Sequence, residues 1–532
     1  MSEQIYYLRE DVYFEPLFNH WYAWSYLIPP VTGARHMVNT HRRIMNSFVK
    51  NYHLHILANK EKNMTGGEFL NCTSEQVEDI KFLIEDIDTK QKVLVELSKA
   101  VEELNQLMSE HTSGTSIDYL YPKVPQCLKG MVEIFMDLEH RPSYRFIEPL
   151  VYKSELYKPQ LQSVSFGILS EDNERPFILS TPRLPDDKHL QLNLRFDSII
   201  LDRLFSSRYM PLSEEEINGI FEGVESRGGL NHWCLFTKEK SPYQPEKVTE
   251  GVKLEFIGHA GFLVETAEVA ILIDPVIASR GKTHADEIFG YTQLPEKIDF
   301  ICLTHSHQDH INLETLLQLR HKTNKILVPK NNGGSLADPS MRLMLKQLGF
   351  DVDEIDDLDE IDVPGGKIVG IPFLGEHGDL NIRTKSAWFI ELLGKRIFFG
   401  ADSSNPDNNL YQHLARDYGD LDLLAIGMEC VGAPYTWLYG ALHTQPVSKV
   451  IRNSRRLNGS DYEQAFPMVE AFRAKRLCIY ALGMEPWYKY FMGIDYDDDS
   501  AQIRESGKLL EACQKINVPG EMLVGRKTIH FT

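Results

Sequence analysis

The stretch Thr304-His305-Ser306-His307-Gln308-Asp309-His310 contains three histidines and an aspartate within six residues, directly after a short apolar run. In extended backbone, residues two apart project to the same side, so His305 and His307 can bind one metal ion together. The turn into the following helix brings Asp309 and His310 round to face a second ion. Imidazole and carboxylate are both good ligands for divalent transition metals. A histidine-rich surface loop would not explain the strand–loop–helix context, so the motif predicts a dinuclear metal site.

Short apolar runs of strand length fill the second half of the chain. They are Val252–Ile257, Gly261–Glu265, Val269–Ile273, Phe300–Leu303, Ile326–Val328, Lys367–Phe373, Ala387–Leu393, Arg396–Phe399, Leu421–Ile426 and Leu477–Ala481. Leucines at helical spacing follow the metal motif, at Leu313, Leu316, Leu317 and Leu319. Strands mixed with helices at this density predict a layered α/β fold with a large mixed sheet.

The first half of the chain has a different pattern and is predicted to be mainly helical. An amphipathic helix is expected over His41–Leu57, and Ser74–His111 has apolar residues at a spacing near 3.6, which predicts one or two long helices. A bundle core and a dimer face would produce the same apolar stripe. Alternation over Leu190–Leu194 predicts a strand. The aromatic cluster Trp21–Trp24 is expected in the core, with an interface role as the alternative.

A polar segment separates the two halves. Thr237–Glu250 is charged and contains two prolines, which is typical of an interdomain linker. We therefore predict an N-terminal α+β domain over residues 1–245 and a second domain over residues 246–532.

Composition and charge restrict the class of function. The chain has 532 residues and a formal net charge of −20, which argues against a nucleic-acid surface because binding phosphates needs clustered Lys and Arg. No signal peptide is readable at the N-terminus, and no stretch has the length of a membrane helix. Seven dispersed cysteines without a Cys-x-x-Cys pair predict neither a disulfide framework nor a thiolate zinc site. We expect a soluble cytoplasmic protein without a membrane partner.

The motif His-x-His-x-Asp-His after an apolar strand resembles the signature of the metallo-β-lactamase superfamily. The upstream segments Gly258–Gly261 and Ile271–Pro275 resemble that superfamily too. The resemblance implies an αβ/βα sandwich in the C-terminal half. It also implies further ligands from a loop, from an aspartate after a strand and from a final histidine. Those positions fall on Gly375-Glu376-His377, on Asp402 and on His443.

The chain as a whole resembles a narrower family, the diiron β-hydroxylases. This resemblance rests on early blocks outside the metal motif, namely Val12–Ser25, Leu94–Ala100 and Phe177–Leu184. In that family the loop ligand is a glutamate, which corresponds to Glu376. Adjacent residues on extended backbone point opposite ways, so only one of Glu376 and His377 is expected to bind metal. His377 is then a supporting residue or the alternative ligand.

The resemblance implies a complete ligand set with two carboxylates, Glu376 and Asp402, at the reactive centre. The expected ligands are His305, His307, Asp309, His310, Glu376, Asp402 and His443. A set this rich in oxygen favours iron over zinc, and a carboxylate at Asp402 can bridge two cations. His259 and Asp274 are expected either to orient ligands or to stabilise turns. Tyr435, Trp437 and Tyr439 are expected either to line a substrate channel or to pack in the core.

The function that the resemblance implies is an O2-dependent non-haem diiron monooxygenase of antibiotic biosynthesis. It would hydroxylate the β-carbon of an aminoacyl group tethered to a carrier domain of a nonribosomal peptide synthetase. Two Fe ions, O2 as co-substrate and an external electron donor are implied, because no flavin or nicotinamide site is readable. A small redox protein or reductase is the expected donor. The N-terminal domain would serve homodimer formation and carrier docking.

Two other functions compete with this prediction. A dizinc hydrolase of the same fold would attack an ester, thioester, amide or phosphoester with a metal-bound hydroxide. A non-catalytic binding protein could retain the fold without the chemistry. Glu376 as a ligand and the large N-terminal domain favour the hydroxylase over the first alternative, and the full set of candidate ligands argues against the second.

Overall fold

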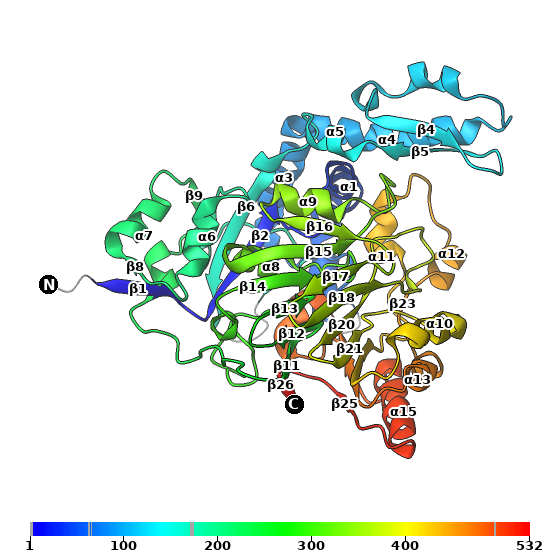
Figure 1. Cartoon of the computed structure of the whole chain (residues 1–532). Helices are drawn as coiled ribbons and strands as arrows, with labels where there is room; N and C mark the ends of the chain where they lie inside the picture. Colours follow the sequence, from blue (N-terminus) through cyan, green and yellow to red (C-terminus); the bar gives the residue numbers. More distant parts are fainter. Residues whose placement is uncertain (1–3, 62–63, 65, 171–174, 494–495) are drawn as a thin grey trace.

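The computed structural model describes residues 4–61, 64, 66–170, 175–493 and 496–532 (Figure 1). Its C-terminal half contains two seven-stranded sheets. In spatial order the first sheet consists of β16 (Val352–Ile355), β15 (Thr323–Pro329), β14 (Ile298–Cys302), β13 (Ala270–Ile273), β12 (Gly261–Glu265), β11 (Val252–Gly258) and β26 (Lys527–Phe531). The second consists of β17 (Glu360–Val363), β18 (Gly366–Ile371), β20 (Ala387–Leu392), β21 (Lys395–Phe399), β22 (Leu423–Gly427), β24 (Leu477–Tyr480) and β25 (Gly520–Met522).

Each sheet is partly parallel, and its parallel strands need helical crossovers. The helices after these strands are α8 (Leu313–Leu319), α9 (Met341–Gln347), α10 (Asn408–Tyr418), α13 (Tyr462–Ala471) and α15 (Ala501–Lys515). One hydrophobic core lies between the sheets and includes Leu254, Phe262, Ile390 and Phe399. Another lies between the second sheet and helices α10, α13 and α15. This arrangement confirms the predicted αβ/βα sandwich.

The N-terminal half adds a five-stranded sheet, a three-stranded sheet, a hairpin and helices. The five-stranded sheet is β3 (Trp21–Tyr22), β2 (Val12–Phe18), β6 (Gln162–Ile168), β7 (Leu190–Leu192) and β9 (Ser226–Arg227). The three-stranded sheet is β10 (Phe236–Thr237), β1 (Ile5–Leu8) and β8 (Leu212–Ser213), and the hairpin is β4 (Val132–Met136) with β5 (Pro142–Phe146). The helices are α1 (Pro30–His36), α2 (Arg43–Ala58), α3 (Val77–Lys90), α4 (Lys92–Glu110), α5 (Glu148–Tyr152), α6 (Ile199–Ser206) and α7 (Glu214–Phe221), with a π-helical turn over Met37–Arg42.

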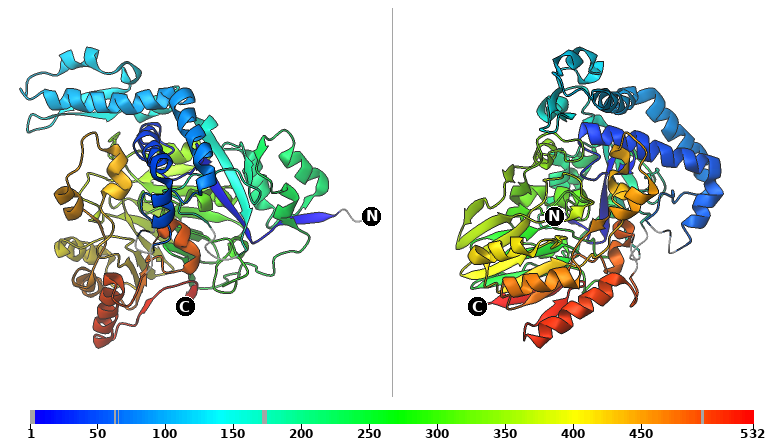
Figure 2. Two further views of the ribbon diagram at one scale, coloured as in Figure 1. Left: turned by 180° about the vertical axis from the view of Figure 1, so that it is seen from behind. Right: turned by 90° about the vertical axis from the view of Figure 1, so that its right-hand side faces the viewer.

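The long helical pattern over Ser74–His111 forms α3 and α4, which are divided at Gln91. Its apolar stripe is buried within the same chain: Ile80, Leu83, Ile87, Leu94, Leu97, Val101 and Leu104 all belong to the large core cluster. The stripe is therefore part of a core and does not form a dimer face. Figure 2 shows these N-terminal helices and the C-terminal helix α15 at opposite ends of the molecule.

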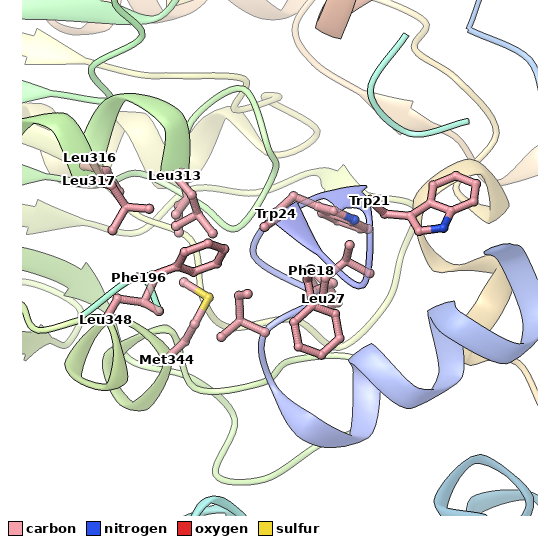
Figure 3. Packing of buried hydrophobic residues seen from close by; sticks show 14 of the residues in the cluster. Phe18, Trp21, Trp24, Leu27, Phe196, Leu313, Leu316, Leu317, Met344 and Leu348 are labelled. Carbon is pink, nitrogen blue, oxygen red and sulfur yellow. The ribbon is translucent and has the colours of Figure 1, made fainter. Parts of the chain in front are cut away.

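The two halves share one hydrophobic core. Trp21 and Trp24 are buried, as predicted, at 1% and 4% exposure. Figure 3 shows Trp24 and its neighbours packed towards Leu313 of α8 and Met344 of α9. The N-terminal half thus covers the helices that flank the first sheet. Between Thr237 and Val252 there is no helix or strand in this described stretch, which is where the linker was expected.

A buried ionic cluster also joins the halves. Arg175 lies 2.8 Å from Glu15 of β2 and 2.6 Å from Glu314 of α8, and Arg183 lies 2.5 Å from Glu15. Burial raises the pKa of Glu15, but the guanidinium groups of Arg183 and Arg175 outweigh burial and lower this pKa to about 2. Buried charges of this kind are stable only when paired, and this cluster pairs residues of both halves.

Two further observations concern the cysteines and the hydropathy of the helices. All seven cysteines are free, so the chain has no disulfide framework. No helix among the described residues is long and apolar enough to cross a membrane.

Candidate metal centre

Four loops meet at one edge of the sandwich, where the predicted metal motif lies. Strands β18, β21 and β22 run in the same direction, so their carboxyl ends reach the same edge. The loop after β14 joins them through a backbone hydrogen bond from Ser386 N to Thr304 O at 2.7 Å. Clustered side chains are expected at such an edge. In chain order they are His305, His307, Asp309, His310, Glu376, Asp402 and Glu429.

One group of ligand atoms comes from His305, His307 and Glu376, which lie within 4.8 Å of one another. His307 Nδ1 is 2.9 Å from Glu376 Oε1 and 3.2 Å from His305 Nε2. All three residues are buried. Two imidazoles and one carboxylate this close together can hold one divalent ion.

A second group consists of His305, His310 and Asp402. Asp402 Oδ2 lies 2.9 Å from His310 Nε2 and 3.7 Å from His305 Nε2. Asp309 Oδ2 is 3.9 Å from His310 Nε2, and these two residues form a further group with His259. Asp402 thus shares a group with two histidines, and Asp309 and His310 lie together beside it, an arrangement that would suit a second ion.

Glu429, which follows β22, completes the cluster and was missed in the sequence. Its carboxylate forms a third group with Glu376 and Asp402. A Cβ at Gly432 would collide with the Glu429 carboxylate, and one at Gly459 would lie 3.1 Å from Glu429 Cβ. Glycine at both positions leaves room for this side chain. The signal was present, because Glu429 follows an apolar strand in the same way that Asp402 does.

His443 does not join the cluster, so the expectation that it is a ligand is corrected. Its ring packs edge-on against Tyr435, with centroids 5.4 Å apart, and it lines a separate surface groove. The 3-10 turn Gly440–Leu442 ends in extended backbone at His443, which carries the ring away from the metal groups. Tyr439, one turn earlier, faces the cluster in its place.

The Tyr439 hydroxyl contacts two histidines at once. It lies 2.9 Å from His307 Nε2 and 2.7 Å from His377 Nδ1. A hydroxyl can donate one hydrogen bond and accept another, so Tyr439 links the two rings. This contact uses the far nitrogen of His307 and leaves Nδ1 directed at Glu376. Of the adjacent pair Glu376 and His377, the structure thus places the glutamate among the ligand groups and the histidine against Tyr439.

His259 and Asp274 contact ligands directly. His259 Nε2 is 3.1 Å from Asp309 Oδ2, and Asp274 Oδ2 is 2.7 Å from His310 Nδ1. Asp274 also accepts a hydrogen bond from the backbone N–H of Thr304 at 2.7 Å. Such partners fix the ring orientation and raise the basicity of a metal-binding histidine. Of the two roles considered from the sequence, orienting ligands is the one that these contacts support.

Several residues beside the site have left-handed backbone. Glu376 has a φ of 62°. Ala401, which precedes Asp402, has a φ of 48°, and Cys430, which follows Glu429, has a φ of 57°. This conformation is costly for a residue with a Cβ and persists where the surroundings enforce it, often at functional sites. A Cβ at Gly427 would lie 2.6 Å from Asp402 Oδ1, so this close approach requires glycine.

The buried carboxylates of the cluster lie close together, and bound cations would stabilise them. Burial, followed by Glu376 and Asp402, raises the pKa of Glu429 well above its usual value. Burial also raises the pKa of Glu376. Among the described residues, Glu376 Oε2 and Asp402 Oδ1 are buried and have no hydrogen-bond partner. Two cations would satisfy these oxygens and offset the repulsion between the carboxylates. The residues present therefore fit a dinuclear, oxygen-rich metal centre.

A cavity opens onto the cluster. Its metal-facing wall includes Glu376, Asp402 and Glu429, and its opposite wall is largely apolar: Trp437, Leu438, Leu457, Ala481, Phe491 and Met492. Trp437 and Leu438 belong to α11 (Thr436–Tyr439), and Phe491 and Met492 belong to α14 (Lys489–Met492). Of the three aromatic residues considered from the sequence, Trp437 lines the cavity, Tyr439 contacts the ligands and Tyr435 is buried beside them.

Comparison with known proteins agrees with this geometry. Residues 7–240 match the family model described as "Diiron non-heme beta-hydroxylase N-terminal domain", and residues 270–477 match a beta-lactamase superfamily domain. The chain is 35% identical over 533 positions to the 4-amino-L-phenylalanyl-[CmlP-peptidyl-carrier-protein] 3-hydroxylase of Streptomyces venezuelae, covering 99% of this chain and 100% of that protein. The chain belongs to the diiron β-hydroxylase family.

The structures of this diiron β-hydroxylase family agree over the whole chain. The crystal structure of CmlA, a diiron β-hydroxylase of Streptomyces venezuelae, has a TM-score of 0.91 at 35% identity and covers 100% of both chains. A mutant of the CmlA β-hydroxylase has a TM-score of 0.89 and covers 99% of this chain. By contrast, a metal-dependent hydrolase of Brucella suis is 31% identical over only 102 residues, or 16% of this chain. These matches favour the hydroxylase over the hydrolase alternative.

Proposed function

We propose that this diiron β-hydroxylase acts on an aminoacyl group held as a thioester on a peptidyl-carrier domain of a nonribosomal peptide synthetase. The observation that supports the proposal most is the three-carboxylate cluster beneath an apolar-walled cavity, in a chain that matches a carrier-dependent 3-hydroxylase from end to end. The product would be the β-hydroxylated aminoacyl thioester, still attached to its carrier.

Two iron ions would be held by His305, His307 and Glu376 on one side and by Asp309 and His310 on the other. Asp402 and Glu429 would supply further carboxylate oxygens, since Asp402 groups with His305 and His310 and Glu429 groups with Glu376 and Asp402. Bound iron supplies the redox chemistry that activates O2 for hydroxylation, which protein side chains cannot perform alone. O2 as co-substrate and a small redox protein as electron donor are parts of the proposal.

The chain itself positions the substrate and excludes water. Trp437, Leu457 and Phe491 provide the apolar wall against which a substrate side chain would pack, with its β-carbon directed at the carboxylate cluster. Displacing water from this space strengthens the electrostatic interactions within it. The Tyr439 hydroxyl forms hydrogen bonds with His307 Nε2 and His377 Nδ1. These bonds would maintain the orientation of the His307 ring that iron binding needs.

A homodimer in the cytoplasm is the proposed assembly and location. Because α3 and α4 bury their apolar stripe inside the chain, a dimer interface has to use other surfaces of the N-terminal half. Light scattering at micromolar concentration tests the assembly, and a monomeric mass would contradict it.

The test of function combines metal analysis with a product assay. Enzyme reconstituted anaerobically with ferrous iron is expected to bind two irons per chain and, given O2 and a chemical reductant, to add the mass of one oxygen atom to a carrier-bound amino acid. The same amino acid free in solution is the control and should remain unchanged. Binding of zinc with release of the amino acid from its thioester would support the hydrolase and overturn the proposal.

A further inference from the structure

A basic segment stands out in this acidic chain. The chain contains 76 Asp and Glu residues, yet none lies between Glu429 and Asp461. Within that stretch, residues 449–456 contain four cations: Lys449, Arg452, Arg455 and Arg456. Their first part forms helix α12 (Lys449–Ser454), which lies at the edge of the molecule in Figure 1. A local positive patch on a protein of net charge −20 indicates a surface that meets an acidic partner.

Helix α12 also exposes apolar side chains. Val450 is 79% exposed and Ile451 is 45% exposed, and Val431 beside this segment is 55% exposed. No residue of α12 is buried. Exposed apolar residues surrounded by cations are typical of a protein-binding site, because apolar contacts supply affinity and charges supply orientation.

Two of the cations are available to a partner. Arg455 and Arg456 donate to the backbone carbonyls of Gly378 and Gly432, at 2.7 Å each. Lys449 and Arg452, by contrast, have no side-chain hydrogen bond or ion pair to any residue that the structure describes. They can therefore bind an external anion without breaking a contact.

A groove leads from α12 towards the metal centre. It is lined by Arg452, His443, Thr444 and Trp437, with Arg43 and Asn39 on the N-terminal side. Its carboxylates are already occupied, since Glu68 pairs with Arg43 and Glu102 pairs with Arg35. Trp437 lines both this groove and the metal cavity. Its Nε1 donates to the carbonyl of Gly66 at 3.0 Å, which holds the ring between the two spaces.

We propose that α12 and this groove are the docking surface for the carrier domain. Val450 and Ile451 contact the carrier, while Lys449 and Arg452 bind its acidic groups, including the phosphodiester of its pantetheine arm. The arm then lies in the groove and passes Trp437 to present the thioester-bound amino acid at the metal cavity. This inference rests on the proposed function, because only a carrier-bound substrate needs such a surface.

The test uses the full-length, iron-loaded enzyme with the double variant Lys449→Glu/Arg452→Glu. An exposed lysine on α9 provides the matched control, Lys346→Glu. Binding of the aminoacyl carrier domain is measured directly, and KM is measured for that substrate and for a small aminoacyl-pantetheine thioester without a phosphate. Because two attractive contacts become repulsive, we expect the double variant to raise the carrier Kd and KM by about tenfold or more.

Iron content should be unchanged in the double variant, and turnover of the small thioester, which lacks the phosphate that Arg452 would bind, should fall far less than turnover of the carrier-bound substrate. The Lys346→Glu control should keep the carrier Kd within about twofold of the parent enzyme. A second variant, Val450→Ser/Ile451→Ser, should weaken carrier binding while keeping its dependence on salt, which the charge-reversed variant should lose.

The outcomes separate the docking surface from the proposed function. If the parent enzyme binds the carrier without hydroxylating it and the double variant does not bind, the docking surface stands and the function fails. If hydroxylation occurs and the double variant keeps the parent Kd and KM, the function stands and the docking surface is wrong. A parent enzyme that does not bind the aminoacyl carrier would overturn both.

Discussion

Glu429 provides the sharpest test of the metal centre, because the structure places its carboxylate among the candidate ligand groups, whereas His443 lies outside them. The perturbation is Glu429→Gln, which keeps the volume and removes one charge. The Glu429, Glu376 and Asp402 ligand atoms lie within 4.8 Å of one another. At an effective dielectric constant of about 20, two unit charges at this separation repel by about 3.5 kcal/mol. In the absence of metal, burial and this repulsion raise the pKa of Glu429, so that folding at neutral pH costs free energy either to keep the carboxylate ionised or to protonate it.

The substitution should therefore have opposite effects on the two forms of the protein. Without metal, the removal of repulsion should raise the melting temperature. With metal, the loss of an anionic ligand should lower the affinity for ferrous iron by about 100-fold, or about 2.8 kcal/mol. The loss is limited to this size because the amide oxygen of glutamine can still approach a cation.

The assay is anaerobic titration with ferrous iron in competition with a chelator, together with thermal melting of the metal-free and iron-loaded forms. His443→Ala is the matched control, and we expect it to keep both irons because His443 lies in the surface groove. The reasoning would be refuted if Glu429→Gln kept the parent affinity, or if His443→Ala lost as much iron.

Three further predictions concern residues around the site and the domain contact. Glu376→Ala should abolish or greatly weaken iron loading, whereas His377→Ala should leave the iron stoichiometry near normal; equal losses by metal analysis would contradict this assignment. Tyr439→Phe leaves two buried ring nitrogens without their hydroxyl partner and should lower the free energy of unfolding by about 1–3 kcal/mol in denaturant titrations; no change in stability or in iron affinity would contradict the contact. Arg175→Met leaves buried carboxylates unpaired and should cost about 3–5 kcal/mol, part of which a second change, Glu15→Gln, should recover. Because the pKa of Glu15 is lowered to about 2 from 4.5, the stability from this ion pair is present above pH 4.5 and is lost as the pH falls towards 2, so the effect of Arg175→Met should shrink on acidification.

The contact between the two halves predicts what happens when the chain is cut at the linker. The core cluster with Trp24 and Leu313 continues through both halves, and the Arg175 cluster is buried between them. Separating the halves would expose apolar surface and unpaired charge together. The C-terminal sandwich cut at the linker is therefore expected to aggregate.

Local patterns in the sequence determined much of this protein. Strand runs and the His305–His310 motif are local features, because periodicity and metal-ligand spacing depend on residues close together in the chain. They predicted a layered α/β fold and the position of the metal motif, whereas the αβ/βα sandwich was implied by the family resemblance. Burial of Trp21 and Trp24 was predictable for the same reason. The preference for Glu376 over His377 came from family resemblance, since spacing alone left both open.

The tertiary structure decided which distant side chains meet. Glu429 joins Glu376 and Asp402 because three strands of the same direction end at one edge. Its place after an apolar strand is visible in the sequence, but the strand order that brings the three carboxylates together is not. His443 departs because a short 3-10 turn ends just before it. Periodicity likewise could not show whether the apolar stripe on α3 and α4 packs in a core or against a partner chain. An apolar stripe indicates that a helix face is buried but does not identify what it packs against. Contacts between residues far apart in the chain depend on the packing of whole elements, so only the folded chain reveals them.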